Sequence, residues 1–340
     1  MGYASDLRTF FRFLLSANPE LSARQIDAKK NIAIDDNKNQ AANDHTDSSD
    51  NAAVLDSYIS GISLKDIESL KPVDIEEYME YLKLYDSPND QTTITNGERG
   101  LKRKISSLRS FYTYYYKRQA IETNPVQLVD MPKIHDKAII RLDAGETAAL
   151  LDYIEHCGDQ LTGQRKAYYE KTKLRDLAIV TLLLGTGIRV SECVGLDVED
   201  IDFRNNGIRL IRKGGSEMVV YFGPEVEKAL KDYLESRKAI SPLEGHEHAL
   251  FYSTQRKRIG VQAVENLVKK YARAITTTKK ITPHKLRSTY GTTLYQETGD
   301  IYLVADVLGH KDVNTTKKHY AAMDDARRRK AATAIRLRED

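Results

Sequence analysis

Apolar residues recur at helical spacing along most of the chain. The first such segment, YASDLRTFFRFLLSANP, places Leu7, Phe10, Phe11 and Leu14 at the i, i+3, i+4 and i+7 positions of an amphipathic helix. Later segments share this period, and Pro72 marks the start of one of them. We therefore predict helices over SLKDIESL, DIEEYMEYLKLY, RLDAGETAALLDYIEH and KLRDLAIVTLLLGTG, the last of which ends in two glycines.

The segment IDFRNNGIRLIRKGGSEMVVYF departs from this pattern, because its apolar and polar residues alternate as in a β-strand. Asn206-Gly207 and Gly214-Gly215 are turn signals of β-hairpins. They divide the segment into three strands, and helical spacing returns after it. The predicted fold is mainly α with a small antiparallel β-sheet, and the sheet belongs to a C-terminal domain of the α+β type.

The length of the chain indicates two domains, because 340 residues exceed what one typical core holds. The segment NPVQLVDMPKIHDK contains two prolines and has no period, as is typical of a linker. A polar, acidic stretch after the first helix has no period either, and we interpret it as a disordered insertion. The predicted parts are a helical domain at 1–131 with the insertion at about 27–53, a linker at 132–138, a second domain at 139–323 and a tail helix at 324–340.

Charge is distributed unevenly along the chain. The net charge is +3, but the stretch from Asp35 to Asp90 has 14 acidic and 4 basic residues, so it carries −10 and the rest carries +13. A basic surplus of this size indicates a polyanionic partner such as DNA. The alternative is ordinary solvated surface charge, which composition alone does not separate from DNA binding.

Neither a membrane segment nor a secretion signal is visible. The longest apolar run, LAIVTLLLG, is far shorter than the roughly 20 residues that a membrane span needs. The first residues do not combine a basic region with an apolar core, so we expect no signal peptide. Cys157 and Cys193 are the two cysteines, and Cys193 lies in an apolar helical pattern. We expect a cytoplasmic protein with reduced thiols and no membrane partner.

The segment ERGLKRKISSLRSFYTYYYKR predicts a long basic helix. Leu101, Ile105, Leu108 and Tyr112 form its apolar stripe, which leaves the basic residues for the outer face. Such a helix fits the major groove of a DNA duplex and can bind phosphates; the alternative is a solvated basic face. The candidate DNA-binding residues are Arg99, Lys102, Arg103, Lys104, Arg109, Lys117 and Arg118.

Two segments place arginines where a helix does not need them. In LLLGTGIRVSECVGL, Arg189 follows a Gly-Thr-Gly break between apolar stretches and needs an anionic partner, because a buried unpaired charge is costly. That partner is either Glu192 or a bound anion. In ITPHKLRSTYGTTLYQETG, His284 and Arg287 share a face near a predicted helix N-terminus, which favours phosphate. Alternatively, His284 only satisfies the helix end.

The helix that holds His284 and Arg287 has clear start signals and a predicted inner face. Thr282 is the expected cap and Pro283 the first helical residue. The residues that we expect on its core face are Leu286, Tyr290, Thr293 and Leu294.

The segment DIYLVADVLGHKDVNTTKKHY predicts a short helix that Gly309 ends, with His310 in the following turn. A further helix is expected from about Asp312, with Tyr320 on its inner side. An inward tyrosine is usually a core residue, so this position alone indicates no chemistry. The separations of His284, His310 and His319 match no metal-ligand spacing, so we predict no metal site.

The order and local context of these motifs resemble the tyrosine recombinase (integrase) family over nearly the whole chain. Two departures from the family pattern are visible: Ser288 stands where many relatives have a second histidine, and Arg212 stands where they have glycine. The residues that carry the resemblance are Arg189, Lys213 in RKGG, His284 and Arg287 in HKLR, His310 in LGH and Tyr320.

The resemblance implies a site-specific recombinase, most similar to the Xer-type resolvases of chromosome dimers, that acts without metal, ATP or other cofactor. Tyr320 would attack the phosphate, helped by His284, and Lys213 would protonate the leaving 5′-oxygen. Arg189, Arg287 and His310 would bind the phosphate, while His319 projects about 100° away from Tyr320 on a helix and takes no part. A 3′-phosphotyrosyl intermediate and a Holliday junction would follow.

The resemblance also implies an assembly on DNA. Relatives hold the duplex in a C-shaped clamp of two domains and form tetramers on two sites, with the tail exchanged between protomers. For this chain, the alternative is that the tail packs on its own protomer or on DNA. Three other functions stay open: a mobile-element integrase or excisionase, a type IB-like topoisomerase, and a DNA-binding architectural protein without activity.

Overall fold

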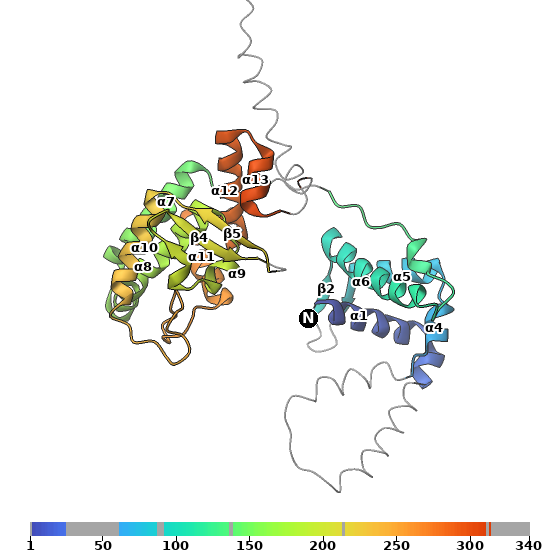
Figure 1. The fold of residues 1–340 in the computed structure, drawn as a ribbon. Helices are drawn as coiled ribbons and strands as arrows, with labels where there is room; N and C mark the ends of the chain where they lie inside the picture. The colour runs from blue at the N-terminus through green and yellow to red at the C-terminus, as the bar shows by residue number, and fades with distance from the viewer. Residues whose placement is uncertain are drawn as a thin grey trace, which may run out of the picture. The chain divides into compact units, whose positions relative to one another are not determined.

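The computed structural model describes residues 2–24, 61–86, 92–135, 139–212, 215–310 and 313 (Figure 1). The chain divides into two compact units, Met1–Lys137 and Ala138–Asp340. The predicted insertion at 27–53 and the predicted tail helix at 324–340 lie outside the described residues. Among the described residues, no helix is long and apolar enough to cross a membrane.

The first unit is helical with one short hairpin. Its predicted helices are present, but the one that starts at Pro72 ends at Lys83, so the prediction of a helix through Tyr85 is wrong. Residues 84–86 pair instead with residues 93–95, with Leu84 opposite Thr95. The helical spacing of apolar residues does not reveal such a pairing between strands. The elements are α1 (Gly2–Ala17), α4 (Leu64–Glu68), α5 (Pro72–Lys83), β1 (Leu84–Asp86), β2 (Thr93–Thr95), α6 (Glu98–Lys117) and the 3-10 turn η1 (Pro125–Gln127).

The core of this unit is aromatic. Phe10 of α1 packs edge-on against Tyr78 of α5, with their ring centroids 5.1 Å apart. The predicted stripe of α6 is confirmed at Ile105 and Tyr112, both fully buried, and the Tyr112 hydroxyl donates to Ile67 O at 2.9 Å. Burial of such large side chains is the main source of stability in a small helical unit.

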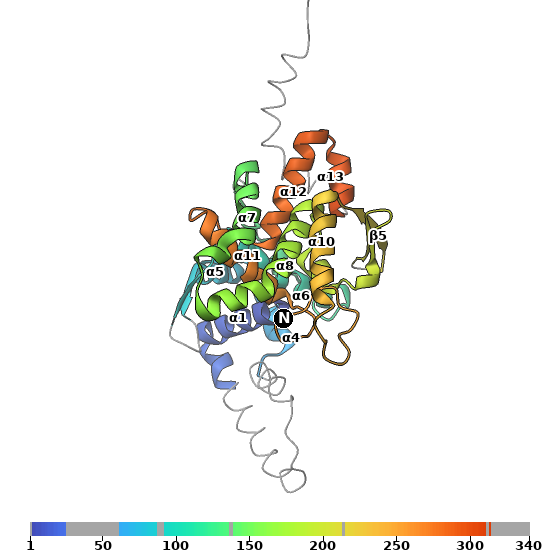
Figure 2. The same cartoon turned by 90° about the vertical axis from the view of Figure 1, so that its left-hand side faces the viewer.

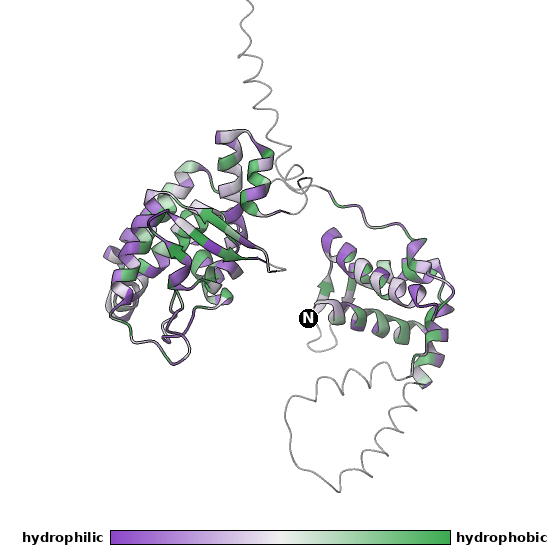
Figure 3. Cartoon of the chain, viewed as in Figure 1, coloured by the Kyte–Doolittle hydropathy of each residue, from purple (hydrophilic) through white to green (hydrophobic). Residues whose placement is uncertain are grey.

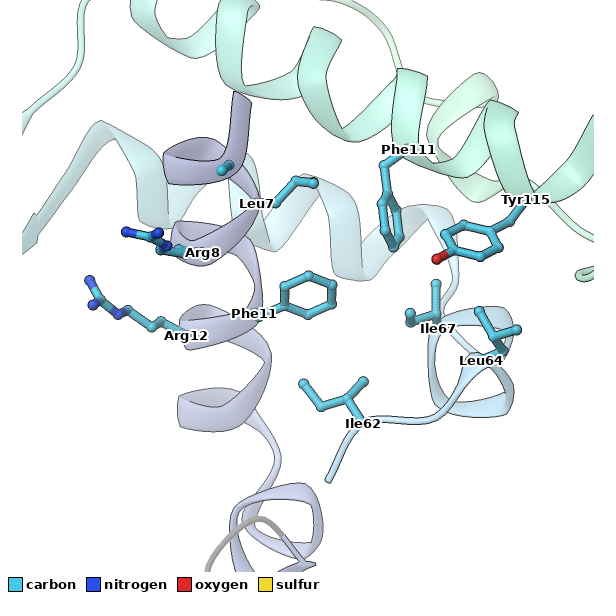
Figure 4. A pocket seen from close by; sticks show the side chains of 10 residues that line it. Leu7, Arg8, Phe11, Arg12, Ile62, Leu64, Ile67, Phe111 and Tyr115 are labelled. Atoms are coloured by element: carbon cyan, nitrogen blue, oxygen red, sulfur yellow. The ribbon is translucent and has the colours of Figure 1, made fainter. Parts of the chain in front are cut away.

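An apolar pocket of about 380 Å³ remains between α1, α4 and α6 (Figure 4). Phe11, Phe111 and Ile67 face one another across it, whereas the guanidinium groups of Arg8 and Arg12 point away from these side chains.

The second unit packs helices around α8. Residues 178–183 in the C-terminal half of α8 are all buried, and α7, α10 and α12 pack against this helix. A small sheet lies along one side of these helices (Figure 2), and its strands carry many apolar residues (Figure 3). The elements are α7 (Ala144–His156), η2 (Cys157–Gln160), α8 (Gly163–Thr186), α9 (Val190–Gly195), η3 (Val198–Asp200), β3 (Ile201–Asp202), β4 (Gly207–Ile211), β5 (Glu217–Tyr221), α10 (Pro224–Arg237), α11 (Val261–Ile275), α12 (Pro283–Thr298) and α13 (Ile301–Leu308).

The predicted three-stranded antiparallel sheet is confirmed, with strand order β3-β4-β5. Asn206 in the first turn has a positive φ of 51°, as its turn signal indicates. Along β4, Ile208 and Leu210 are buried while Arg209 and Ile211 are exposed, the alternation expected of a sheet with one solvated face. The mainly α fold with a small antiparallel sheet is therefore the fold that the sequence predicts.

Two glycines end helices that shape the site described below. Gly187 caps α8 with φ 63°, and a Cβ there would lie 2.3 Å from the ring of Tyr290 in α12. Gly309 caps α13 with φ 62°, which confirms the predicted stop. Glycine adopts this left-handed conformation with the least strain, so residue type favours both breaks.

Candidate functional site

The C-terminal turn of α13 collects three arginines from distant parts of the second unit. Arg212 Nη2 donates to Val307 O at 3.0 Å, Arg189 Nη2 donates to Gly309 O at 3.2 Å, and Arg287 Nη2 donates to Leu308 O. The last carbonyls of a helix have no partner within it and carry partial negative charge, so they suit guanidinium groups. This turn therefore brings Arg189 and Arg287 together.

Arg189 pairs with Glu192, one of the two kinds of partner considered from the sequence. Its Nη1 lies 2.7 Å from Glu192 Oε1, and its backbone N–H donates to Glu192 Oε2 at 2.7 Å. With the bond to Gly309, the side chain engages two of the five N–H donors of a guanidinium, and it stays 40% exposed. Arg189 can thus bind a further anion without losing its protein partners.

Glu192 is a buried carboxylate between two guanidinium groups. Burial alone would raise the pKa of Glu192, but hydrogen bonds from the backbone and side chain of Arg189 outweigh it, and the charge of Arg212 adds to their effect. The pKa of this carboxyl is therefore lowered, and Glu192 is ionised at neutral pH. An ionised Glu192 holds Arg189 in a fixed orientation.

Arg287 is buried at the junction of three helices. Its Nη1 donates to Gly187 O at 2.5 Å, and its Nη2 donates to Leu308 O, so the side chain links the break after α8 to the end of α13. His284 is exposed and lies one turn earlier, in the first turn of α12, which begins at Pro283 after the cap Thr282. The sequence predicted this helix start correctly.

The predicted core face of α12 is partly wrong. Leu286 is buried as expected, but Thr293 is exposed. Thr289 and Thr292 are buried instead, and the Thr289 hydroxyl accepts from the backbone N–H of Leu142 at 3.0 Å. The inward face thus includes Thr289 and Thr292, which a pattern of apolar residues does not detect because threonine is counted as polar.

His310 follows the arginine-binding turn directly. Its backbone N–H donates to Ala305 O at 2.9 Å, which fixes the residue at the end of α13. Arg189 and Arg287 therefore bond to the two residues that precede His310, and His284 lies one turn from Arg287. Lys213 and Tyr320, the other two predicted catalytic residues, lie outside the described residues, as does the predicted helix from Asp312 that would carry Tyr320.

The sequence did not indicate that Arg212 belongs to this cluster. Its Nε lies 3.7 Å from Glu192 Oε1, and its side chain is only 10% exposed. The one signal for it in the sequence is the arginine itself, at a position where the family resemblance implies glycine.

The basic helix α6 divides into buried and exposed cations. Lys104 is buried, and its Nζ lies 3.3 Å from Asp6 Oδ1, so the prediction that it faces outward is wrong. Arg103 pairs with the same carboxylate, and Arg109 donates to Val126 O and Val129 O at 3.0 Å. These three cations hold α6 in its own unit.

The remaining basic residues of α6 are accessible. Arg99, Lys117 and Arg118 are exposed and Lys102 is partly exposed. The Arg118 guanidinium also stacks on the exposed ring of Tyr114, with 3.8 Å between its carbon and the ring centroid. This face combines positive charge with an aromatic surface.

Comparison with known proteins identifies the family. The phage integrase family matches residues 141–327, which include every residue of the cluster at the end of α13. The chain belongs to the phage integrase family. Among its members, the tyrosine recombinase XerC of Caldanaerobacter subterraneus subsp. tengcongensis is 34% identical over 284 residues, 82% of this chain and 73% of that protein. The tyrosine recombinase XerS of Lactococcus lactis subsp. cremoris is 31% identical over 278 residues, 76% and 78% of the two chains.

Solved structures of integrase-family proteins share the fold. A post-cleavage complex of the XerH site-specific recombinase with palindromic difH substrate aligns over 82% of this chain and 77% of that one, with a TM-score of 0.61 and 18% identity. The Tn1549 transposon integrase with transposon right end DNA aligns over 88% and 98%, with a TM-score of 0.60 and 22% identity. At these identities the likeness concerns the fold alone.

Proposed function

We propose that this member of the phage integrase family is a site-specific DNA recombinase that cuts and rejoins strands through a 3′-phosphotyrosyl intermediate. The observation that carries the proposal is the convergence of Arg189 and Arg287 on the end of α13, next to His310. Two guanidinium groups suit the two non-bridging oxygens of a phosphodiester, which gain charge in the transition state.

The residues divide the reaction among them. Tyr320 Oη attacks the phosphorus and forms the phosphotyrosyl bond while the bond to the 5′-oxygen breaks. The proton of Tyr320 passes to His284, and Lys213 supplies the proton that the leaving 5′-oxygen needs. His310 donates a hydrogen bond to the phosphate. The 5′-hydroxyl of a partner strand then attacks the phosphotyrosine, which reseals DNA through a Holliday junction without metal, ATP or other cofactor.

The domain organisation fits a clamp on double-stranded DNA. We propose that the helical domain at 1–131 binds one face of the duplex through Arg99, Lys102, Lys117 and Arg118, and that the domain at 139–323 binds the other. Arg103, Lys104 and Arg109 are left out of this surface because they bond within their own unit. In the proposed assembly, the linker at 132–138 completes a C-shaped clamp.

Four protomers on two sites would form the synaptic complex, joined by the tail at 324–340. The relatives named XerC and XerS support a role like theirs, which we propose to be the resolution of chromosome dimers at the nucleoid in the cytoplasm. The second candidate is a mobile-element integrase, because the Tn1549 transposon integrase has the same fold and the fold alone does not separate the two roles.

A plasmid assay tests the reaction and the candidates together. Genomic DNA bound by the protein is mapped first, and two copies of the bound site are placed in direct repeat on a supercoiled plasmid. A recombinase excises the intervening circle, and the junction sequence shows whether the site lies at the chromosome terminus or at the end of a mobile element. Relaxation of the plasmid without excision would contradict recombination and indicate a topoisomerase, and binding without either would indicate an architectural protein.

A further inference from the structure

Arg212 connects the sheet to the turn that holds the phosphate-binding arginines. It follows β4, and its guanidinium reaches Val307 O at 3.0 Å and lies 3.7 Å from the carboxylate of Glu192. A buried charge is costly unless it is paired and hydrogen-bonded. Among the described residues, the side chain of Arg212 donates one hydrogen bond, to Val307 O, and its charge is paired with Glu192, while its buried Nε has no hydrogen-bond partner. Its burial therefore depends on both the end of α13 and Glu192.

The backbone of Arg212 is fixed as firmly as its side chain. Its N–H donates to Ser216 O at 2.9 Å, and its carbonyl accepts from the N–H of Gly215 at 3.0 Å. These two bonds close the turn between β4 and β5. The residue is therefore anchored in the hairpin at one end and in α13 at the other.

The guanidinium of Arg212 also fills the space over Gly309. A Cβ added to Gly309 would fall 1.4 Å from Arg212 Nη1, so a side chain at that position and the observed Arg212 exclude each other. Packing this close leaves the turn little room to move. The same turn accepts hydrogen bonds from Arg189 and Arg287.

We infer that Arg212 is a positioning residue for the reaction: it holds the Val307–Gly309 turn and Glu192 in the arrangement that presents Arg189 and Arg287 to the scissile phosphate. The inference rests on the proposed function and adds a residue to it. Glu192 accepts from Arg189 at 2.7 Å and faces Arg212 across 3.7 Å, so the two guanidinium groups share one carboxylate. Arg212 itself bonds to protein atoms and needs no contact with DNA.

The test compares two duplexes that differ only at the scissile position. Both are nicked near the cleavage point so that the cut strand diffuses away and the covalent adduct accumulates. One carries the natural phosphate, and the other carries a methylphosphonate, in which a methyl group replaces one non-bridging oxygen and removes its charge. If Arg189 and Arg287 are misplaced, adduct formation should slow more on the phosphate duplex, which has both non-bridging oxygens, than on the methylphosphonate duplex.

Two variants and a matched control are needed. Arg212→Met keeps the stem of the side chain and removes its hydrogen bond to Val307 and its charge. Arg212→Lys keeps the charge but lacks the fork that reaches two partners. Arg209→Met is the control, because Arg209 lies on β4, three residues before Arg212, and its side chain is 57% exposed and pairs with Asp200.

With Arg212→Met we expect adduct formation on the phosphate duplex to fall by about tenfold to a hundredfold, the effect of a small misplacement of binding groups. The fall on the methylphosphonate duplex should be several-fold smaller, because Arg212→Met and the loss of a non-bridging oxygen both weaken the same contact between arginines and phosphate. Binding of the uncut duplex should stay unchanged. Arg212→Lys should be intermediate, and Arg209→Met should match the wild type on both duplexes.

An equal fall on both duplexes would contradict the inference and indicate a general structural role, and no fall would contradict it too. Thermal unfolding of each variant checks that the fold is kept; if Arg212→Met does not fold, the same comparison with Arg212→Lys decides. A wild type that forms no adduct on the phosphate duplex contradicts the proposed function itself. A wild type that reacts while Arg212→Met reacts equally well contradicts only the role of Arg212.

Discussion

Lys104 should stabilise the protein rather than bind DNA, although it lies on the basic helix α6. Its side chain is 6% exposed, and its Nζ lies 3.3 Å from the carboxylate of Asp6, which is 1% exposed. Ser107 donates to the same carboxylate at 2.9 Å, and Arg103 pairs with it at the surface. Asp6 thus has three partners, whereas Lys104 has Asp6 as its one countercharge among the described residues, together with the hydroxyl of Thr9 and the ring of Tyr85.

This asymmetry sets the expected magnitudes. Asp6→Ala leaves the ammonium group of Lys104 buried without its countercharge, so the free energy of unfolding should fall by about 3 to 5 kcal/mol. Lys104→Met keeps the apolar stem and leaves Asp6 with two partners, so the loss should be about 1 to 3 kcal/mol. The double variant should lose less than the sum of the two, because both changes remove the same pair.

Urea unfolding of the full chain measures these losses, and DNA binding at several salt concentrations measures the contacts to phosphate. Lys104→Met should leave the slope of log binding constant against log salt unchanged. The exposed Arg99 is the matched control. Arg99→Met should change stability by no more than about 0.5 kcal/mol, and it should make the negative slope less steep by about 0.9. If Lys104→Met left the stability unchanged and made the salt slope less steep, the reasoning would be refuted.

Two further predictions concern the site. Gly309→Ala places a side chain at φ 62° and 1.4 Å from Arg212 Nη1. The free energy of unfolding should therefore fall by at least about 1 kcal/mol, and DNA cleavage should fall as well. Full cleavage activity would contradict the packing of Arg212 against Gly309. The lowered pKa of Glu192 contributes stability above the unfolded pKa of about 4.3, and this contribution is lost as pH falls through the folded pKa. Glu192→Gln should therefore weaken the loss of stability on acidification, measured by urea unfolding from pH 7 to pH 3, and an unchanged pH profile would contradict this.

Most of the fold follows from local patterns. Ile105 and Tyr112 recur at helical spacing, and Asn206-Gly207 is a turn signal, so α6 and the sheet were predictable. The pairing of Leu84 with Thr95 was not, because it depends on which strands meet. The burial of Lys104 was missed for a similar reason, since its partner Asp6 lies on another helix.

The sequence singles out the two arginines of this cluster, but it does not show how they are brought together. The motifs around Arg189 and Arg287 mark them as anion-binding groups, but no local pattern says that the carbonyls at the end of α13 bring them together. Arg212 has no motif of its own. Its place becomes visible only when the end of β4 lies beside Val307 and Glu192.

The most direct test of the central claim is the covalent adduct at Tyr320. Protein is incubated with a nicked duplex of its mapped site, denatured, and separated on a gel, and the peptide attached to DNA is identified by mass. The account predicts an adduct for the wild type, with the 3′-phosphate of the cut strand on Tyr320, and none for Tyr320→Phe, which should still bind the duplex. No adduct with the wild type, or an undiminished adduct with Tyr320→Phe, would contradict the account.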